Sequence, residues 1–276
     1  IKYEVTVNPP EFETTIHNKE VITTQLNASS ITVLSDLPIL RKGMLEITPE
    51  TLHFRLTEHS LEKIEIGAFD NQNITETISL NSNKLTVIAS TTFKNLKIRV
   101  LDLDYNEITH VEENAITDMP NLVQVLLSRN RIVKFHANSF VNTPNVWELD
   151  MQYNELGELG EKWFSFMKKE EALVILLGYN NIEKIHPKTF DGISIWTLAL
   201  SHNKLNEVPG EIFTGNLVEL MLNNNALEDL PDTFFQQRNL RRLSIGYNPL
   251  NCGTLQKLKM LAEGNILLTM YNNQYC

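Results

Sequence analysis

The chain has 276 residues, 42% hydrophobic and 21% charged, which is ordinary for a folded domain. Its 24 Lys and Arg against 34 Asp and Glu give a formal net charge of −10, which argues against nucleic acid as a ligand because such binding needs cations to neutralise phosphates. No apolar run approaches the roughly 20 residues of a membrane-spanning helix, so we expect no membrane insertion by this segment.

The first part of the chain matches a repeating pattern only weakly. Residues 1–20 show no repeat and are interpreted as an N-terminal segment. Two degenerate copies follow, in which Ser29 and His59 take the position of the repeat's anchor residue. The 30 residues between these two positions predict an insertion in the first copy.

From residue 75 onward one template recurs, L-x-L-x-x-N-x-L-x-x-L, with a Phe or a similar residue ten positions after the Asn. Successive anchors lie 22 to 26 residues apart. They are Asn83, Asn106, Asn130, Asn154, Asn180, Asn203, Asn225 and Asn248. We therefore expect about ten repeats over residues 21–251, the first two of them degenerate, followed by a C-terminal cap over residues 252–276.

The positions of the Leu and Asn residues within each repeat predict its local structure. Alternation in L-x-L makes a short strand with leucines inward and the x residues outward. The Asn side chain can bond backbone groups of the neighbouring coil that would otherwise lack partners. A lone repeat buries too little apolar surface to offset the entropy of ordering it, so only a stacked array folds. We predict an α/β leucine-rich repeat solenoid (a horseshoe), with a parallel sheet on the concave face and an irregular, 3-10 or helical convex face.

The C-terminal end predicts a helical cap. Asn248-Pro249-Leu250-Asn251-Cys252 closes the last repeat, and residues 254–262 have helical apolar spacing with Gly264 as the stop. This arrangement resembles the C-terminal cap of secreted and cell-surface leucine-rich repeat proteins. It departs from the widespread form because its entry holds one Cys where C-x-C is usual, and because the chain has no cysteine-bearing N-terminal cap.

The two ends point to a narrower resemblance. The opening Val21-Ile22-Thr23-Thr24-Gln25-Leu26 and the cap start Cys252-Gly253-Thr254-Leu255 are similar to those of the leucine-rich immune proteins of mosquitoes. That resemblance implies a secreted, disulfide-linked protein that holds a complement-like thioester protein. It also implies a homo- or heterodimer formed through a coiled coil and further cysteines beyond Cys276.

Two kinds of covalent modification fit such a setting. We expect a disulfide between Cys252 and Cys276, because extracellular repeat arrays commonly end this way and oxidising compartments favour it. Two free buried thiols are the alternative. The sequons at Asn27 and Asn73 are candidate glycosylation sites, although such tripeptides also arise by chance in a chain this rich in Asn.

The outward strand positions are the expected recognition surface. The candidate partner-binding residues are the acidic and aromatic residues and the Arg of the middle repeats, Asp102, Asp104, Tyr105, Arg129, Asp150, Tyr153 and Tyr179. Aromatic residues and Arg often anchor interfaces, and the carboxylates could steer a basic partner. Leu176, Ala199 and Met221 add an apolar stripe, flanked by Trp147 and Trp196. The alternative is that the Tyr side chains pack on neighbouring backbone and the Asp side chains are simply solvated.

The sequence contains no catalytic or cofactor motif. The seven histidines fall in different repeats without zinc-ligand spacing, and no phosphate loop or G-x-S-x-G occurs. Asp102 and Asp150 could suit a glycosidase, but any acidic concave row gives such a pair. We expect no enzyme, no cofactor and no metal. The leading hypothesis is a secreted innate-immunity protein that scaffolds or recognises a protein partner, including one from a pathogen. The alternative is the ectodomain of a membrane-anchored receptor or adhesion protein.

Overall fold

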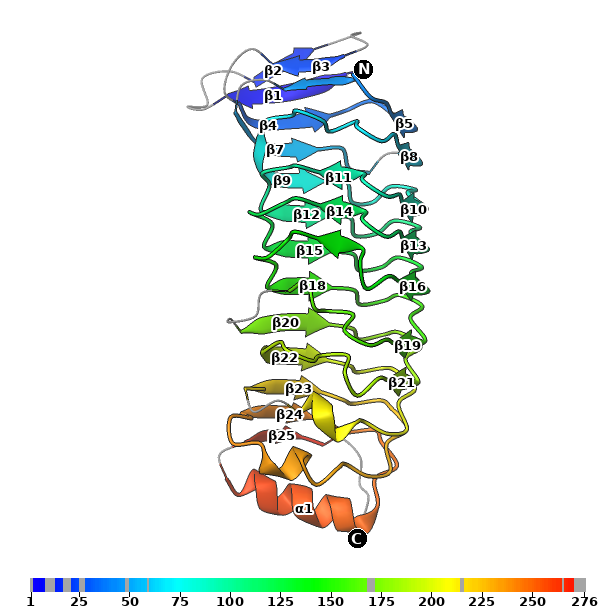
Figure 1. Ribbon diagram of the computed structural model, residues 1–276, viewed down its shortest axis with the longest axis vertical. Helices are drawn as coiled ribbons and strands as arrows, with labels where there is room; N and C mark the ends of the chain where they lie inside the picture. Colours follow the sequence, from blue (N-terminus) through cyan, green and yellow to red (C-terminus); the bar gives the residue numbers. More distant parts are fainter. Residues whose placement is uncertain are drawn as a thin grey trace. The chain divides into compact units, whose positions relative to one another are not determined.

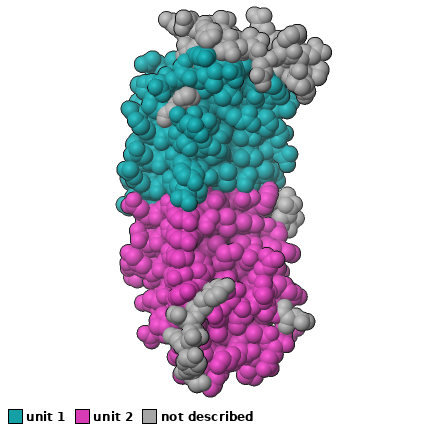
Figure 2. Space-filling view, turned by 180° about the vertical axis from the view of Figure 1, so that it is seen from behind, with its two compact units in different colours: residues 1–146 teal, residues 147–276 magenta. Residues whose placement is uncertain are grey.

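The computed structural model describes residues 2–7, 13–16, 21–24, 28–47, 50–58, 60–167, 172–213, 216–264 and 266–270. The chain divides into two compact units, residues 1–146 and residues 147–276, which Figure 2 colours separately. Each unit is built from stacked repeat coils, and each is described by itself. The predicted leucine-rich repeat solenoid fold is confirmed in both.

The main sheet of unit 1 contains one strand from each repeat (Figure 1). Its parallel strands are β4 (Ala28–Val33), β7 (Thr51–Arg55), β9 (Ile74–Ser79), β12 (Val100–Asp102) and β15 (Gln124–Leu126). The N-terminal segment adds β1 (Tyr3–Val7), which pairs antiparallel with β4, and β2 (Glu13–Ile16), which pairs antiparallel with β1. These two strands extend the sheet where the sequence showed no repeat.

The return side of unit 1 also forms short parallel ladders, where the sequence analysis expected irregular or helical structure. The paired strands are β3 (Ile22–Thr24) with β6 (Leu45–Ile47), and β5 (Ile39–Leu40) with β8 (Lys63–Ile64). Two three-stranded ladders follow, β10 (Val87–Ile88), β13 (His110–Val111) and β16 (Lys134–Phe135), and β11 (Phe93–Lys94), β14 (Ile116–Thr117) and β17 (Phe140–Val141). Equal repeat lengths allow this, because matching backbone groups then face each other from coil to coil.

Unit 2 continues the same plan with a more varied return side (Figure 1). Its parallel main sheet is β18 (Glu148–Asp150), β20 (Leu173–Leu176), β22 (Ile195–Ala199), β23 (Glu219–Met221), β24 (Arg242–Ser244) and β25 (Leu267–Thr269). The return side pairs β19 (Glu158–Leu159) with β21 (Lys184–Ile185), and then has two 3-10 turns, Gly210–Ile212 and Phe234–Gln236.

The core of each unit follows the predicted inward positions, with Phe side chains stacked behind the strands. Phe69 lies 5.6 Å from Phe93, and Phe164 lies 5.2 Å from Phe190, measured between ring centroids. One assignment was wrong. Phe234, not Phe235, fills the core position of the last full repeat, because the 3-10 turn shifts the chain by one residue. Phe235 instead lies 5.1 Å from the Lys257 ammonium.

The placement of the first repeat was also wrong. Ile31 pairs with Phe54, so the strand register puts the anchor at Asp36 and not at Ser29. Position 59 then follows 23 residues later, and the repeat has no insertion. The polar Ser29 between Leu26 and Ile31 imitated the template, but Ile31 and Val33 are the buried pair. His59 itself lies outside the described residues.

The predicted cap helix is confirmed as α1 (Cys252–Ala262), which lies at one end of unit 2 (Figure 1). The Asn251 side chain caps it by accepting from the backbone N–H of Thr254 at 2.9 Å. Leu255 and Leu258 are buried against the last coil, and β25 then joins the sheet. Cys276 lies outside the described residues, so the Cys252–Cys276 disulfide stays a prediction.

The anchor asparagines join each coil to the one before it. The Asn203 amide donates to the carbonyls of Leu177 in the preceding coil and of Leu200 in its own, both at 3.0 Å. Its carbonyl accepts from the backbone N–H of Ile182 in the preceding coil at 2.9 Å. The same three kinds of bond recur at Asn83, Asn106, Asn130, Asn180, Asn225 and Asn248. The sequence-based role of the Asn is confirmed.

We expect Asn203→Ala to destabilise the protein strongly. The change leaves the Ile182 N–H and the Leu177 carbonyl buried without this partner, and an unsatisfied buried group costs about 1–3 kcal/mol. Asn206→Ala removes the same side chain from an exposed position three residues later and is the matched control. The measurement is the urea midpoint of unfolding. Equal midpoints for the two variants would contradict the role given to the anchor.

Candidate binding surface

The residue before each anchor Asn has a left-handed backbone, with φ between 53° and 58°. This conformation is unfavourable for residues other than Gly. A bond to the next coil holds it in place at most of these positions, where the backbone N–H donates to a carbonyl, as from Tyr179 to Ser201 at 2.8 Å. The same bond is made by Ser82, Tyr105, Tyr153, His202 and Asn224. The side chains at this position therefore form a column beside the main sheet. In unit 2 they are Tyr153, Tyr179, His202, Asn224 and Tyr247.

Three of these side chains stack into an aromatic ladder, which we define as Tyr153, Tyr179 and His202. The ring centroids of Tyr153 and Tyr179 lie 4.2 Å apart, and those of Tyr179 and His202 lie 4.0 Å apart, with interplanar angles of 10° and 9°. Tyr153 is 38% exposed and Tyr179 is 41% exposed. The faces of the rings are thus packed against one another, and the side chains of Tyr153 and Tyr179 remain partly open to solvent.

Polar contacts hold the ladder in register. A hydrogen bond with the Tyr153 side chain raises the pKa of the Tyr179 hydroxyl, and loss of water around Tyr179 and the charge of Tyr153 act in the same direction. The Asn224 amide nitrogen lies 3.2 Å from His202 Nε2. His202 completes the ladder although the sequence analysis did not select it. The signal was available, because His202 stands in the same column as both tyrosines.

Unit 1 holds the other part of the predicted set. Tyr105 is 54% exposed, and the Arg129 guanidinium carbon lies 5.1 Å above the centre of its ring, a cation–π contact. The predicted residues Asp102, Asp104, Tyr105 and Arg129 therefore belong to unit 1, and Asp150, Tyr153 and Tyr179 to unit 2. Asp102 and Asp150 fall in different units, so the structure does not test whether their carboxylates are close enough to act as a catalytic pair.

The unit 1 carboxylates are bonded within the sheet. Asp102 accepts from the Ser79 hydroxyl at 2.7 Å and from the Asn81 amide at 2.6 Å. Asp104 accepts from the backbone N–H of Ser128 at 2.6 Å. These two side chains satisfy donors on neighbouring strands, so they have a structural role besides any role in binding.

Asp150 in unit 2 is bonded within its own coil. Among the described residues its carboxylate accepts from Gln152 alone, through the backbone N–H at 2.9 Å and the side-chain amide at 3.3 Å. Burial raises the pKa of Asp150 above its ordinary value despite these two bonds. The described residues contain no ion-pair partner for it. Asp150 is therefore the poorly compensated carboxylate of this surface.

The predicted apolar stripe is confirmed beside it. Leu176, Ala199 and Met221 occupy one row, because the strand register pairs Leu176 with Ala199 and Ala199 with Met221. Trp196 at the start of β22 is 49% exposed, whereas Trp147 is half-buried. Leu176, Ala199 and Met221 thus make one apolar row across β20, β22 and β23.

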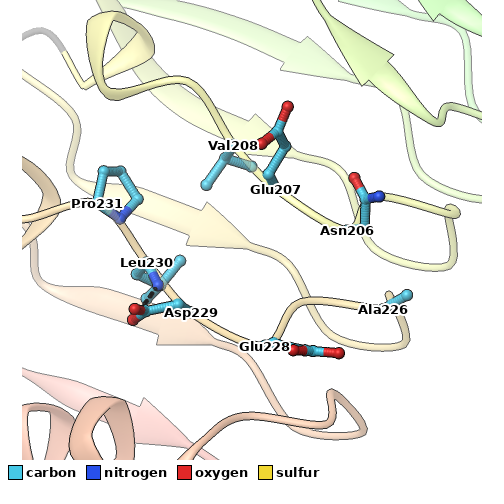
Figure 3. A pocket seen from close by; sticks show the side chains of 8 residues that line it. All are labelled: Asn206, Glu207, Val208, Ala226, Glu228, Asp229, Leu230 and Pro231. Carbon is cyan, nitrogen blue, oxygen red and sulfur yellow. Dashed lines mark hydrogen bonds between the residues drawn. The ribbon is translucent and has the colours of Figure 1, made fainter.

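A pocket lies on the return side of unit 2, between two successive loops (Figure 3). In other coils an N–H six residues after the anchor closes the return ladder, as His186 does to the Leu159 carbonyl at 2.9 Å. Pro209 and Pro231 take this position and have no N–H, so the ladder stops there. Glu207, Glu228 and Asp229 line the resulting pocket. Hydrogen bonds from Thr254 and the Leu230 N–H lower the pKa of Asp229.

The two candidate glycosylation sites differ in what the structure shows. Asn73 is half-buried just before β9, where its backbone N–H donates to the Ile47 carbonyl at 2.9 Å. Asn27 lies outside the described residues. Occupancy of both sites stays a prediction.

Within the ranges that the structure describes, no three His, Cys, Asp or Glu side chains come together as a metal site would require. A search of the same residues for a helix long and apolar enough to cross a membrane also finds none.

Asp150→Asn should stabilise the protein at neutral pH. A raised carboxyl pKa means that the folded state binds the proton more tightly than the unfolded state, so stability falls as pH rises from the unfolded pKa through the folded pKa. The variant keeps an oxygen for the Gln152 N–H and removes the buried charge. We expect a Tm about 1–2 °C above that of the parent chain at pH 7. This difference should shrink toward pH 4; a difference that grows on acidification would contradict the assignment.

Comparison with known proteins gives the family. A model described as the leucine rich repeat matches residues 53–108, 75–132, 97–156 and 194–250, more than half of the chain. The chain is 28% identical to podocan of Mus musculus over 77% of its own length and 35% of podocan. It is 28% identical to lumican of Bos taurus over 76% of its own length and 61% of lumican. The chain thus spans between about a third and two thirds of these relatives.

Solved structures show the same fold at lower identity. A leucine-rich repeat protein from Bacteroides eggerthii DSM 20697 aligns with a TM-score of 0.61 and 18% identity, over 85% of this chain and 46% of that one. A TLR13–ssRNA13 complex aligns with a TM-score of 0.53 and 20% identity, over 72% of this chain and 33% of that one. The repeat template, the asparagine bonds and these matches agree, and the chain belongs to the leucine-rich repeat family.

Proposed function

We propose that this chain is an extracellular recognition scaffold that binds another protein through the outward side chains of its main sheet. The observation that carries the proposal is the aromatic ladder of Tyr153, Tyr179 and His202. Aromatic side chains give large contact areas and have few rotatable bonds, so ordering them at an interface costs little entropy. Stacking has already ordered these rings in the unbound chain. A partner would therefore meet a rigid edge flanked by the apolar stripe.

The extracellular setting is supported by three features. Asn73 belongs to a sequon at a strand edge, Cys252 begins the cap helix, and the relatives are small leucine-rich proteoglycans of the extracellular matrix. A disulfide and a glycan both require the secretory route. Mass spectrometry of protein from the native fluid should find the Cys252–Cys276 peptide cross-linked and a glycan on Asn73. Two free thiols together with an unmodified Asn73 would contradict an extracellular location.

The finer proposal places the chain in innate immunity, and it rests on the resemblance of both ends to the mosquito leucine-rich immune proteins. The partner would be a complement-like thioester protein or a protein from a pathogen. Dimerisation would use segments beyond Cys276. The second candidate is the ectodomain of a membrane-anchored receptor or adhesion protein, which the exposed aromatic ladder would serve equally well. Heptads with further cysteines after Cys276 would favour the first, and an apolar segment of about 20 residues the second.

The ladder should carry much of the affinity. We expect Tyr153→Ala combined with Tyr179→Ala to weaken capture of the native partner at least about 100-fold, because hot-spot truncations cost about 2–4 kcal/mol each. Capture is measured with purified chain in the fluid where the protein occurs, and the captured protein is identified by mass spectrometry. Val133→Ala removes an exposed apolar side chain away from the ladder and serves as the control. Unchanged capture by a folded double variant would refute the proposal.

A further inference from the structure

We propose that unit 2 recognises an extended protein segment in which a Lys or Arg is followed, at alternate positions, by aliphatic side chains. The cation would lie against Asp150 and the aliphatic side chains along Leu176, Ala199 and Met221. This inference rests on the proposed function, since it names the chemistry of the partner at that surface. It goes further by fixing which residue types the partner presents and in what order.

The strand register gives the order. Asp150 pairs with Leu176, Leu176 with Ala199, and Ala199 with Met221, so the four side chains form one row that crosses β18, β20, β22 and β23. Neighbouring strands lie about 4.8 Å apart, which puts Met221 roughly 14 Å from Asp150. An extended segment rises about 3.3 Å per residue, and its side chains alternate, so every second one faces the row. A cation and the aliphatic residues two and four positions later therefore span this row.

Burial within the row gives the site for the aliphatic side chains. Leu176 and Met221 are half-buried, while the small Ala199 between them is only 4% exposed. The small Ala199 therefore leaves less side-chain bulk in the row between two larger apolar side chains. The parallel row on the ladder side passes through Gly178, where an added Cβ would lie 3.3 Å from the Ser201 carbonyl oxygen. The Gln152 side-chain oxygen would lie 3.4 Å from the same added Cβ, so Gly178 is covered by its neighbours and adds no bulk of its own beside Leu176.

Charge selects the residue at the Asp150 end. Asp150 is a half-buried carboxylate that is bonded, among the described residues, by Gln152 alone, and Glu148 lies on the same face of the same strand. Burial raises the pKa of Asp150, because its charge has lost contact with water and the two Gln152 bonds offset that loss only in part. A Lys or Arg would supply that cation while its methylene stem covers apolar surface. An acidic partner would meet two like charges there.

The probe is a displayed library of random twelve-residue peptides, selected on the whole chain. We expect enrichment of Lys or Arg followed by aliphatic residues two and four positions later. For an enriched peptide, Asp150→Asn should raise the Kd about tenfold, and Ala199→Leu, which adds bulk between Leu176 and Met221, should do the same. Glu158→Gln removes a carboxylate from the return side and should leave the Kd unchanged.

The outcomes separate this inference from the proposed function. Enrichment without the cation–aliphatic pattern, or an enriched peptide that binds Asp150→Asn as tightly as the parent, overturns the inference. Because Asp150→Asn is expected to be at least as stable as the parent chain, lost binding cannot be attributed to unfolding. If the native partner is lost with the double Tyr variant but kept with Asp150→Asn, the proposed function stands and this inference fails.

Discussion

The fold depends on one side-chain amide per coil. Each anchor Asn satisfies its own backbone and that of the preceding coil, at a turn where neither strand nor helix can do so. Without these bonds, each coil would bury unpaired N–H and carbonyl groups at every turn. With them, the coils are held at strand spacing and the leucines of successive repeats meet in one core. The left-handed residue before the anchor adds a bond in the other direction, from its own backbone N–H to a carbonyl of the next coil.

The surface derives from that turn. A residue with left-handed backbone projects its side chain beside the sheet, and the stacking of coils brings equivalent side chains close enough to touch. Tyr153, Tyr179 and His202 stack for this reason. Asp102 and Asp150 occupy equivalent positions in the repeat, yet their surroundings differ. Ser79 and Asn81 bond the Asp102 side chain, whereas Asp150 stands beside an apolar row. Equivalent backbone positions thus place the same residue type in different polar and apolar surroundings along the sheet.

Much of this was predictable from the sequence, because the template is periodic and the anchors at Asn83 to Asn248 fix the phase. The errors arose where the template weakens. Ser29 fitted the template, but the strand register puts the anchor at Asp36. Phe235 was predicted in the core, but Phe234 occupies that position because of a 3-10 turn. The antiparallel strands β1 and β2 carry no repeat signature. The stacking of His202 and the poorly compensated charge of Asp150 depend on residues of neighbouring repeats, about 22 to 26 residues away. The linear sequence does not show which of these residues are in contact.

The central claim is that a partner binds the outward side chains of the main sheet of unit 2. Hydroxyl-radical footprinting tests it directly, because Tyr, Trp and Met side chains react readily when exposed. With the native partner bound, Tyr153, Tyr179, Trp196 and Met221 should be protected from oxidation, while Met260 on the outer side of the cap helix should remain reactive. Protection of Met260 with no change at the four main-sheet residues would contradict the account.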